Sequence, residues 1–400
     1  MKSFNVDDKL TNPEVIRIAI FAVYKSLKKS KWKRKHKKAE ALLANTDAYI
    51  ENTIIAVENF EKMKKLQELG LPVPDEILSK AWHPKECSIF TVKDGPNKKE
   101  RDIVSAKDIQ DKIIHQLVVE TGKPVFMKGM YAHSCGSIPG RGTHGGVKYL
   151  KKTINHHTKH DKSAIKYGAV GDVKKCYQSF SHTVLKEQIR KKFRGKLFYW
   201  LTDTIIDGYY YKIENGEKYG IPIGFPTSQW FCNFILTPID HKIKNSGVKY
   251  FVRYVDDLVF FGRSKKHLHK VMAIIKEELI KMGLKLKNIW QVFRYDYIDK
   301  KGKRRGRAFD FLGYRFFRDK IILRKRNALT ISRQARRIKR VSNVTAHTAR
   351  SMMSRLGDIR HCNSLNFYQK NVKPFIDIKK LKGVIRRESR KHNYAAVVCG

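Results

Sequence analysis

Two adjacent aspartates, Asp256 and Asp257, stand in the segment RYVDDLVFF with strand-forming residues on both sides. This pattern predicts a β-hairpin with both carboxylates at its tip. Two adjacent carboxylates in an apolar setting are costly unless a cation offsets their charge. A Lys or Arg partner could do so, and an exposed turn would avoid the cost, but a pair of divalent ions accounts best for the clustering.

A third aspartate, Asp172, follows the apolar run IKYGAVG at the end of a predicted buried strand. Asp172 and Asp256 are 84 positions apart, which allows their strands to be neighbours. Phosphodiester synthesis uses two metal ions, one to activate the attacking 3′-hydroxyl and one to neutralise the triphosphate leaving group. We therefore expect Asp172 and Asp256 to bind metal, with Asp257 beside them.

The composition points to a polyanionic partner. The 400 residues include 84 Lys and Arg against 37 Asp and Glu, which gives a formal net charge of +47. Hydrophobic residues make up 42% and aromatic residues 11%, so the chain is not a disordered polybasic tail. The charge favours nucleic acid over a small metabolite. No apolar run approaches the ~20 residues that a membrane-spanning helix needs. The cysteines are scattered without a paired motif, which favours a reducing, cytoplasmic location.

The elements that must position the aspartates mix helices and strands without regular alternation, which predicts an α+β fold. Residues 88–104 predict a two-stranded hairpin around a turn at 94–97, and residues 183–211 are mostly helical. Ser264 is expected to cap a helix that ends near Gly283. Residues 308–317 predict a strand.

Several blocks, taken in chain order, resemble the reverse transcriptases. The sequences DVKKCY, GFPTSQ, YVDD and FLGY look like the palm motifs A, B, C and E, and Arg101 and GRGTHGG look like upstream finger motifs. YVDD alone is a short string, but this order over residues 88–375 is specific, and the finger blocks resemble the bacterial group II intron-like class. The resemblance implies a right-hand polymerase with these parts: a helical basic N-terminal segment (1–87), fingers (88–166), a palm (167–317, with finger-like helices at about 183–211), and a helical thumb with the C-terminal tail (318–400).

The resemblance also implies roles, position by position. Asp172, Asp256 and Asp257 would be catalytic, and Asp172, the Val173 carbonyl and Asp256 would bind two Mg²⁺ ions, with Mn²⁺ as an alternative. Tyr177 would be the steric gate that crowds a ribose 2′-hydroxyl, with an ordinary core tyrosine as the alternative reading. The other implied roles are dNTP binding (Lys93, Arg101, Tyr177, Gly224, Gln229), fidelity (Ile223, Gln229), primer grip (Phe311, Leu312, Gly313, Tyr314) and pyrophosphate protonation (Lys285 or Lys287).

Motif B departs from the Gln-Gly-x-x-x-Ser-Pro pattern of group II intron and retron enzymes. Ile223 and Gln229 replace the first Gln and the final Pro, and both departures resemble the reverse transcriptases of diversity-generating retroelements. This implies a cytoplasmic enzyme, encoded by a bacterium or phage, that makes errors at template adenines. Its expected partners are an RNA template, a DNA or RNA primer and dNTPs, with a structured noncoding RNA and a small basic accessory protein as further candidates.

Three alternative functions stay open at this point. A phage-defence reverse transcriptase of the same class is the first. A noncatalytic basic RNA-binding scaffold is the second, although acids at strand ends do not suit a pure polyanion binder. An RNA-directed RNA polymerase is the third, and Val255 and the bulky Tyr177 argue against it.

Basic segments outside the motifs are candidate nucleic-acid contacts. Residues 25–38 contain nine Lys or Arg, on either a solvated or a phosphate-contacting segment. The G-x-G-x-x-G string at 140–145 matches a dinucleotide fingerprint, but the residues before it do not predict a strand, so we interpret it as a phosphate cradle assisted by Arg141. Residues 300–307 predict a basic hairpin loop. One predicted helical face would follow the primer–template duplex or face solvent: Arg333, Arg336, Arg337 and Arg340.

Overall fold

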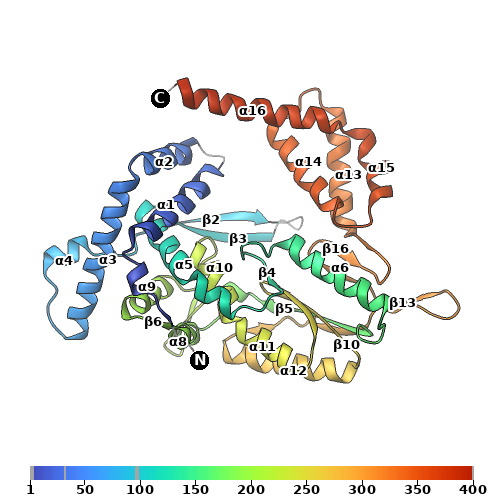
Figure 1. The fold of residues 1–400 in the computed structure, drawn as a ribbon, viewed down its shortest axis with the longest axis horizontal. Helices are drawn as coiled ribbons and strands as arrows, with labels where there is room; N and C mark the ends of the chain where they lie inside the picture. Colours follow the sequence, from blue (N-terminus) through green and yellow to red (C-terminus); the bar gives the residue numbers. More distant parts are fainter. Residues whose placement is uncertain (1–3, 31–32, 95–98, 399–400) are drawn as a thin grey trace.

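The N-terminal part of the chain is helical. The computed structural model describes residues 4–30, 33–94 and 99–398 (Figure 1). Asn12 caps the first long helix by accepting hydrogen bonds from the N–H groups of Glu14 and Val15, and Pro13 occupies the first helical position. The elements of this part are β1 (Phe4–Asn5), η1 (Asp7–Lys9), α1 (Pro13–Lys28), α2 (Lys33–Ala44), α3 (Thr46–Glu68) and α4 (Asp75–Lys80).

The predicted hairpin near residue 90 is present. Strands β2 (Cys87–Asp94) and β3 (Lys99–Ala106) pair antiparallel, and the predicted turn residues 95–98 lie outside the described residues. Helix α5 (Ile109–Gly129) follows and packs against α1, so the N-terminal helices and the hairpin region share one core. Trp82 strengthens this junction, because its Nε1 donates to the Asp111 carboxylate over 2.9 Å.

A central sheet carries the predicted aspartates. Its strand order is β11-β5-β10-β9-β4, with β12 also paired to β5; neighbours are antiparallel except β4, which runs parallel to β9. The strands are β4 (Ser134–Cys135), β5 (Tyr167–Lys174), β9 (Tyr250–Tyr254), β10 (Asp257–Gly262), β11 (Lys285–Leu286) and β12 (Gln291–Arg294).

Both faces of this sheet are buried, which explains the unbroken apolar run in β10. Leu258 and Phe260 join one core, and Val259 and Phe261 join another, because successive side chains point to opposite faces. The first core contains α5, α10 (Pro226–Ile235), α11 (Thr237–Asn245) and α12 (Lys265–Lys281). The second contains α6 (Thr143–Lys159) and the C-terminal elements. Ser264 caps α12 as predicted.

The segment between β5 and α10 is mostly helical, as expected, but a short strand divides it. Residues Phe193 and Arg194 form β6, which pairs in parallel with β1 and so ties the N-terminus to this region. The elements are α7 (Cys176–Ser179), α8 (His182–Lys192), β6 (Phe193–Arg194), α9 (Lys196–Asp207), β7 (Lys212–Glu214) and β8 (Glu217–Tyr219).

The prediction of one strand over 308–317 is wrong. Leu312 (φ 51°) and Gly313 (φ 86°) adopt left-handed backbone and divide the segment into β15 (Phe309–Phe311) and β16 (Tyr314–Phe316). The segment AFDFLGYRFF is mostly apolar and aromatic and carries no signal for such a turn except Gly313 itself. The neighbouring strands are β13 (Tyr297–Ile298), β14 (Arg304–Arg305) and β17 (Ile321–Leu323).

A helical unit ends the chain. Figure 1 shows it at the upper right, with the N-terminal helices on the left and β2 and β3 between the two. Its elements are α13 (Lys325–Arg340), α14 (Ala346–Ile359), α15 (Leu365–Asn371), η2 (Lys373–Phe375) and α16 (Ile378–Val398). The α+β prediction is confirmed. In the described ranges, no helix has the length and apolar character that crossing a membrane would require.

Candidate active site

The three predicted aspartates converge at one end of the central sheet. Strands β5 and β10 pair with Asp172 directly opposite Asp257, and Asp256 lies in the tight turn between β9 and β10. The Val173 N–H donates to the Asp256 carbonyl over 3.1 Å, which fixes the turn against β5. The structure therefore brings together carboxylates that are 84 residues apart in the chain.

This cluster concentrates negative charge. Burial, and then the neighbouring Asp172 carboxylate, raises the pKa of Asp256. Burial, followed by repulsion from Asp256 and Asp172, raises the pKa of Asp257 to about 7. Lys287 offsets part of this charge, because its Nζ donates to Asp172 Oδ2 and its N–H donates to the Asp172 carbonyl.

The donor set fits divalent metal ions of the hard, oxygen-preferring kind. Asp172 Oδ1 is buried without a hydrogen-bond partner among the described residues, and a carboxylate oxygen in that state is a ready ligand. Raised pKa values at Asp256 and Asp257 mean that these groups gain from a nearby cation. Within the described ranges, no three or more His, Cys, Asp or Glu side chains are arranged to hold a metal by themselves.

The two predicted triphosphate-binding residues differ in their surroundings. Lys93 and Glu100 face each other across β2 and β3, with Nζ and Oε1 3.5 Å apart, and both side chains are exposed. Arg101 is the next residue on β3, and its charge acts on the carboxylate cluster: burial raises the pKa of Asp256, and Arg101 opposes that rise. The charge of Arg101 thus acts on the site, whereas Lys93 pairs with Glu100 within its own hairpin.

Tyr177 is the last residue of motif A. Lys175, in left-handed conformation (φ 47°), turns the chain out of β5 into α7, and the Tyr177 carbonyl then accepts the Ile221 N–H over 2.7 Å. Burial, and then the neighbouring Cys232, raises the pKa of the Tyr177 hydroxyl. The side chain is half-buried against the core, so this position is compatible with both the gate and the core reading.

Motif B is joined to the fingers hairpin through its backbone. The Val104 N–H of β3 donates to the Ile223 carbonyl over 2.7 Å. Gly224 follows with φ 135°, and a Cβ at this position would overlap the Val104 carbonyl oxygen, so only glycine permits the approach. The Ile223 side chain is half-buried, and Gln229 is exposed on α10.

Comparison with known proteins identifies the chain. Residues 92–316, more than half of the sequence, match the family model described as reverse transcriptase (RNA-dependent DNA polymerase). The chain belongs to the reverse transcriptase family. Its mixed α and β structure agrees with the polymerase fold that the motifs predicted, and members of this family generally use divalent metal ions.

Several solved structures resemble this chain at low sequence identity. Apo telomerase from Candida tropicalis is 15% identical, with a TM-score of 0.44 over 79% of this chain and 59% of that chain. Telomerase from Candida albicans in complex with the TWJ fragment of telomeric RNA is 12% identical, with a TM-score of 0.44 over 78% of this chain and 61% of that chain. A foamy viral protease-reverse transcriptase in complex with double-stranded DNA is 16% identical, with a TM-score of 0.40 over 79% and 42%. This reverse transcriptase thus spans less than two thirds of each, and no curated protein sequence matches it.

The predicted primer grip of the reverse transcriptase is the β15–β16 turn. Phe311 and Tyr314 are buried in the second core, and the Tyr314 hydroxyl donates to the Asp358 carbonyl over 3.0 Å. Leu312 and Gly313 form the partly exposed tip, so contact with a primer would come from these two residues. A Cβ on Gly146 would lie 2.8 Å from the Leu312 side chain, so the glycine-rich segment packs closely beneath the tip.

The glycine-rich segment differs from our expectation in one respect. Ser134 and Cys135 do form a short buried strand, β4, although their sequence gave no periodic signal. Arg141 Nη1 donates to the Tyr131 carbonyl over 3.0 Å, so part of its guanidinium is used within the protein.

The four predicted thumb arginines are all exposed on α13: Arg333, Arg336, Arg337 and Arg340. Arg336 also lies over the Phe375 ring.

Sequence reasoning missed two buried polar groups of the reverse transcriptase. His115 on α5 hydrogen-bonds the Thr227 hydroxyl over 2.8 Å and stacks on Phe225, and burial lowers the pKa of its ring to about 3. Arg253 on β9 forms a buried ion pair with Asp240. The first contact joins residues 112 apart and the second joins residues 13 apart on different elements, so no helix or strand periodicity reveals either of them. The arginine directly before Tyr254, in an otherwise apolar strand, was the available signal for the second pair.

Proposed function

We propose that this reverse transcriptase extends a DNA or RNA primer with dNTPs on an RNA template at the Asp172, Asp256 and Asp257 cluster. The observation that supports this is the meeting of three carboxylates, one on β5, one in the β9–β10 turn and one at the start of β10, in a chain of net charge +47. One of them, Asp172, has a buried oxygen with no hydrogen-bond partner among the described residues. A protein that only bound nucleic acid would place such acids away from its ligand.

Each residue of the cluster has a proposed task. Asp172, Asp256 and the Val173 carbonyl would hold two Mg²⁺ ions, or Mn²⁺, with Asp257 beside them. Bound there, the ions would lower the pKa of the primer 3′-hydroxyl and neutralise the pyrophosphate leaving group. Arg101 would bind the triphosphate, and Tyr177 would crowd a ribose 2′-hydroxyl. Lys287 Nζ donates to Asp172 Oδ2, and this ammonium would give a proton to pyrophosphate.

Asparagine substitutions test this assignment, because they keep the shape of the side chain and remove its charge. Asp172→Asn and Asp256→Asn should each lower Mg²⁺-dependent primer extension by about 10³-fold or more while RNA affinity stays within a few-fold. Asp8→Asn, at an exposed carboxylate on η1, is the control and should extend normally. Wild-type extension by either active-site variant would refute the two-metal site.

We further propose that the enzyme belongs to a diversity-generating retroelement and copies its template with errors at adenines. The supporting feature is motif B: Ile223 has no side-chain donor or acceptor with which to hold a templating base, and Gln229 replaces a proline and so restores a backbone N–H. A cytoplasmic location in a bacterium or phage-infected cell, a structured noncoding RNA and a small basic accessory protein belong to the same proposal.

Sequencing of the product separates this role from its alternative. Complementary DNA from one defined RNA should show high misincorporation, worst opposite adenine, and Ile223→Gln should reduce it. A polar contact to a base is worth ~1–3 kcal/mol, so the expected reduction is about ten- to a hundredfold. A uniformly low error rate without adenine bias would leave the polymerase assignment intact and favour a phage-defence reverse transcriptase.

A further inference from the structure

Arg253, on β9 just before the catalytic turn, is buried with 1% of its surface exposed. A guanidinium carries five N–H donors, and burying it is costly unless they are satisfied. Its hydrogen bonds number five: Nε to Asp240 Oδ1 (2.8 Å), Nη2 to Asp240 Oδ2 (2.8 Å) and to the Asn233 carbonyl (3.3 Å), and Nη1 to Asn233 Oδ1 (3.1 Å) and to the Val255 carbonyl (2.9 Å). The donor capacity of the side chain is therefore fully used.

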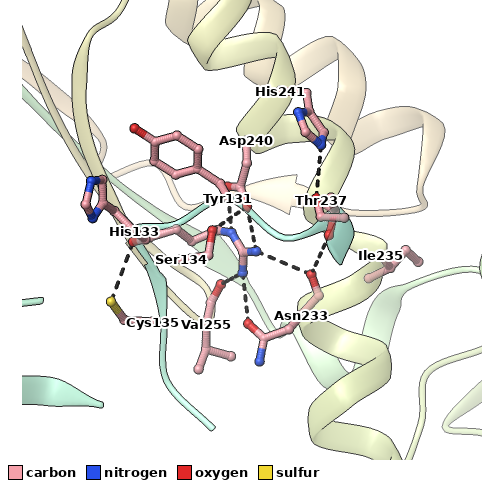
Figure 2. A network of polar contacts seen from close by, with 12 residues as sticks. Tyr131, His133, Ser134, Cys135, Asn233, Ile235, Thr237, Asp240, His241 and Val255 are labelled. Atoms are coloured by element: carbon pink, nitrogen blue, oxygen red, sulfur yellow. Dashed lines mark hydrogen bonds and ion pairs between the residues drawn. The ribbon is translucent and has the colours of Figure 1, made fainter. Parts of the chain in front are cut away.

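The acceptors of Arg253 come from separate elements. Asp240, 0% exposed, lies on α11, and Asn233 lies on α10, which begins in motif B. Figure 2 shows Asp240, Asn233 and Val255 converging on one point, with Ser134 beside them. The Ser134 hydroxyl donates to Asp240 Oδ2 over 2.5 Å, and Asn233 Nδ2 donates to the Gly136 carbonyl over 3.0 Å. The network thus joins motif B, the glycine-rich segment and the strand that leads to the aspartates.

Val255 connects this network to the catalytic aspartates. It has φ 55°, a left-handed conformation that is unfavourable for a β-branched residue and persists only where its surroundings enforce it. Its carbonyl accepts from Arg253, and its N–H donates to the Cys135 carbonyl over 3.0 Å. A Cβ on Gly136 would lie 2.7 Å from the Val255 side chain, so the space around the turn is filled as well. Asp256 is the next residue, and its direction follows from this turn.

We propose that Arg253 is a positioning residue, which holds the turn at Val255 and thereby sets the Asp256 carboxylate at a fixed place relative to the motif B helix. This inference rests on the proposed role of Asp256 as a metal ligand. The Asp240 carboxylate holds the guanidinium plane, and Nη1 transmits that orientation to the Val255 peptide. The pair therefore acts on the metal site without touching substrate or metal.

The test must separate positioning from stability, because removing one partner leaves the other charge buried and unpaired. Arg253→Met combined with Asp240→Leu removes both charges, an exchange that buried ion pairs often tolerate. Arg253→Lys is the second variant: it keeps a charge opposite Asp240, but a single ammonium cannot make five bonds in a plane. For each variant, the melting temperature, the active fraction by primer-burst titration, kcat, the dNTP KM and the Mg²⁺ concentration for half-maximal rate are measured.

We expect kcat per active molecule to fall ten- to a hundredfold in both variants, as is typical when a partner that orients a metal ligand is lost. The Mg²⁺ half-saturation concentration should rise by a similar factor, while RNA affinity and the dNTP KM change little. Arg318→Lys is the control, since Arg318 is a partly buried arginine away from the site and donates to the Asp296 and Ile165 carbonyls. It should alter only the melting temperature.

A folded variant of either kind with wild-type kcat and Mg²⁺ half-saturation would overturn the inference and leave the pair as core packing. If the double variant does not fold, Arg253→Lys alone decides the question by the same two values. Asp256→Asn is measured alongside: normal extension by that variant refutes the proposed metal site itself, whereas an inactive Asp256→Asn with normal Arg253 variants refutes only the positioning role.

Discussion

Replacement of Asp257 by asparagine should stabilise the metal-free protein, and the gain should depend on pH. Asp257 faces Asp172 across β5 and β10, and burial together with the two neighbouring carboxylates raises its pKa from 3.8 to about 7. Between these values the folded protein binds more protons at this site than the unfolded chain does. Folding stability is therefore lost as the pH rises from about 4 to about 7, the sense expected for a carboxyl whose folded pKa is raised.

The magnitude follows from the two pKa values. Each tenfold difference in proton affinity corresponds to ~1.36 kcal/mol, so a change from 3.8 to about 7 sets an upper limit of about 4 kcal/mol. The side chain is partly open to solvent, which lowers the expected effect to about 2–4 kcal/mol above pH 7. Asparagine cannot ionise and removes this destabilisation.

Urea unfolding in the presence of a chelator, at pH 5, 6.5 and 8, measures the effect. Asp257→Asn should exceed the wild type in unfolding free energy at pH 8, and the difference should shrink towards pH 5. Added Mg²⁺ should stabilise the wild type more than the variant, because ligand binding to the folded state adds stability. Asp8→Asn provides the control and should show no such pH-dependent gain. Equal stability of variant and wild type at pH 8, or a difference independent of pH, would refute the electrostatic reasoning.

Three further predictions follow from other parts of the enzyme. Tyr177→Val should raise ribonucleotide incorporation by about ten- to a hundredfold in primer extension, whereas Tyr177→Phe should not; unchanged selectivity in the valine variant would make this residue part of the core. Gly224→Ala should lower the unfolding free energy by ~1–3 kcal/mol in urea and raise the dNTP KM, since its Cβ overlaps the Val104 carbonyl; a silent substitution would mean that β3 moves freely. Glutamates in place of the lysines in the 300–303 loop should reduce the slope of log affinity against log salt by about 2–3 on an RNA duplex, and a constant slope would place this loop away from RNA.

Local patterns predicted the site well. The strand-forming residues on both sides of Asp256 and Asp257 predicted the hairpin turn, and the apolar run before Asp172 predicted β5. Ser264 and Gly283 marked the ends of α12, because capping is decided by the nearest few residues. The polymerase architecture came from the order of the motifs and was confirmed by the family match. The roles of the individual residues stay predictions.

What the sequence did not predict depends on contacts between distant segments. The strand at Ser134–Cys135 exists because β9 offers it an edge, and its own residues carry no strand pattern. The partnership of Arg253 with Asp240 crosses from a strand to a helix, and a buried arginine reads as an ordinary basic residue in a chain with 84 Lys and Arg. The division of 308–317 depends on Leu312 taking a left-handed backbone, which leucine rarely does.

The backbone bond between Val104 and Ile223 has a mechanical consequence. Strand β3 carries Arg101 three residues before Val104. Because Gly224 has no side chain, the backbones of β3 and motif B are in direct contact. A tilt of the hairpin that moves Arg101 towards a triphosphate must pull the Ile223 peptide along or break the bond. The hairpin and motif B would then move together, so that the position of Arg101 at the phosphates would determine the position of the Ile223 backbone at the base. If Arg101 binds the triphosphate as proposed, we expect substitutions on β3 to change copying accuracy as substitutions of Ile223 do.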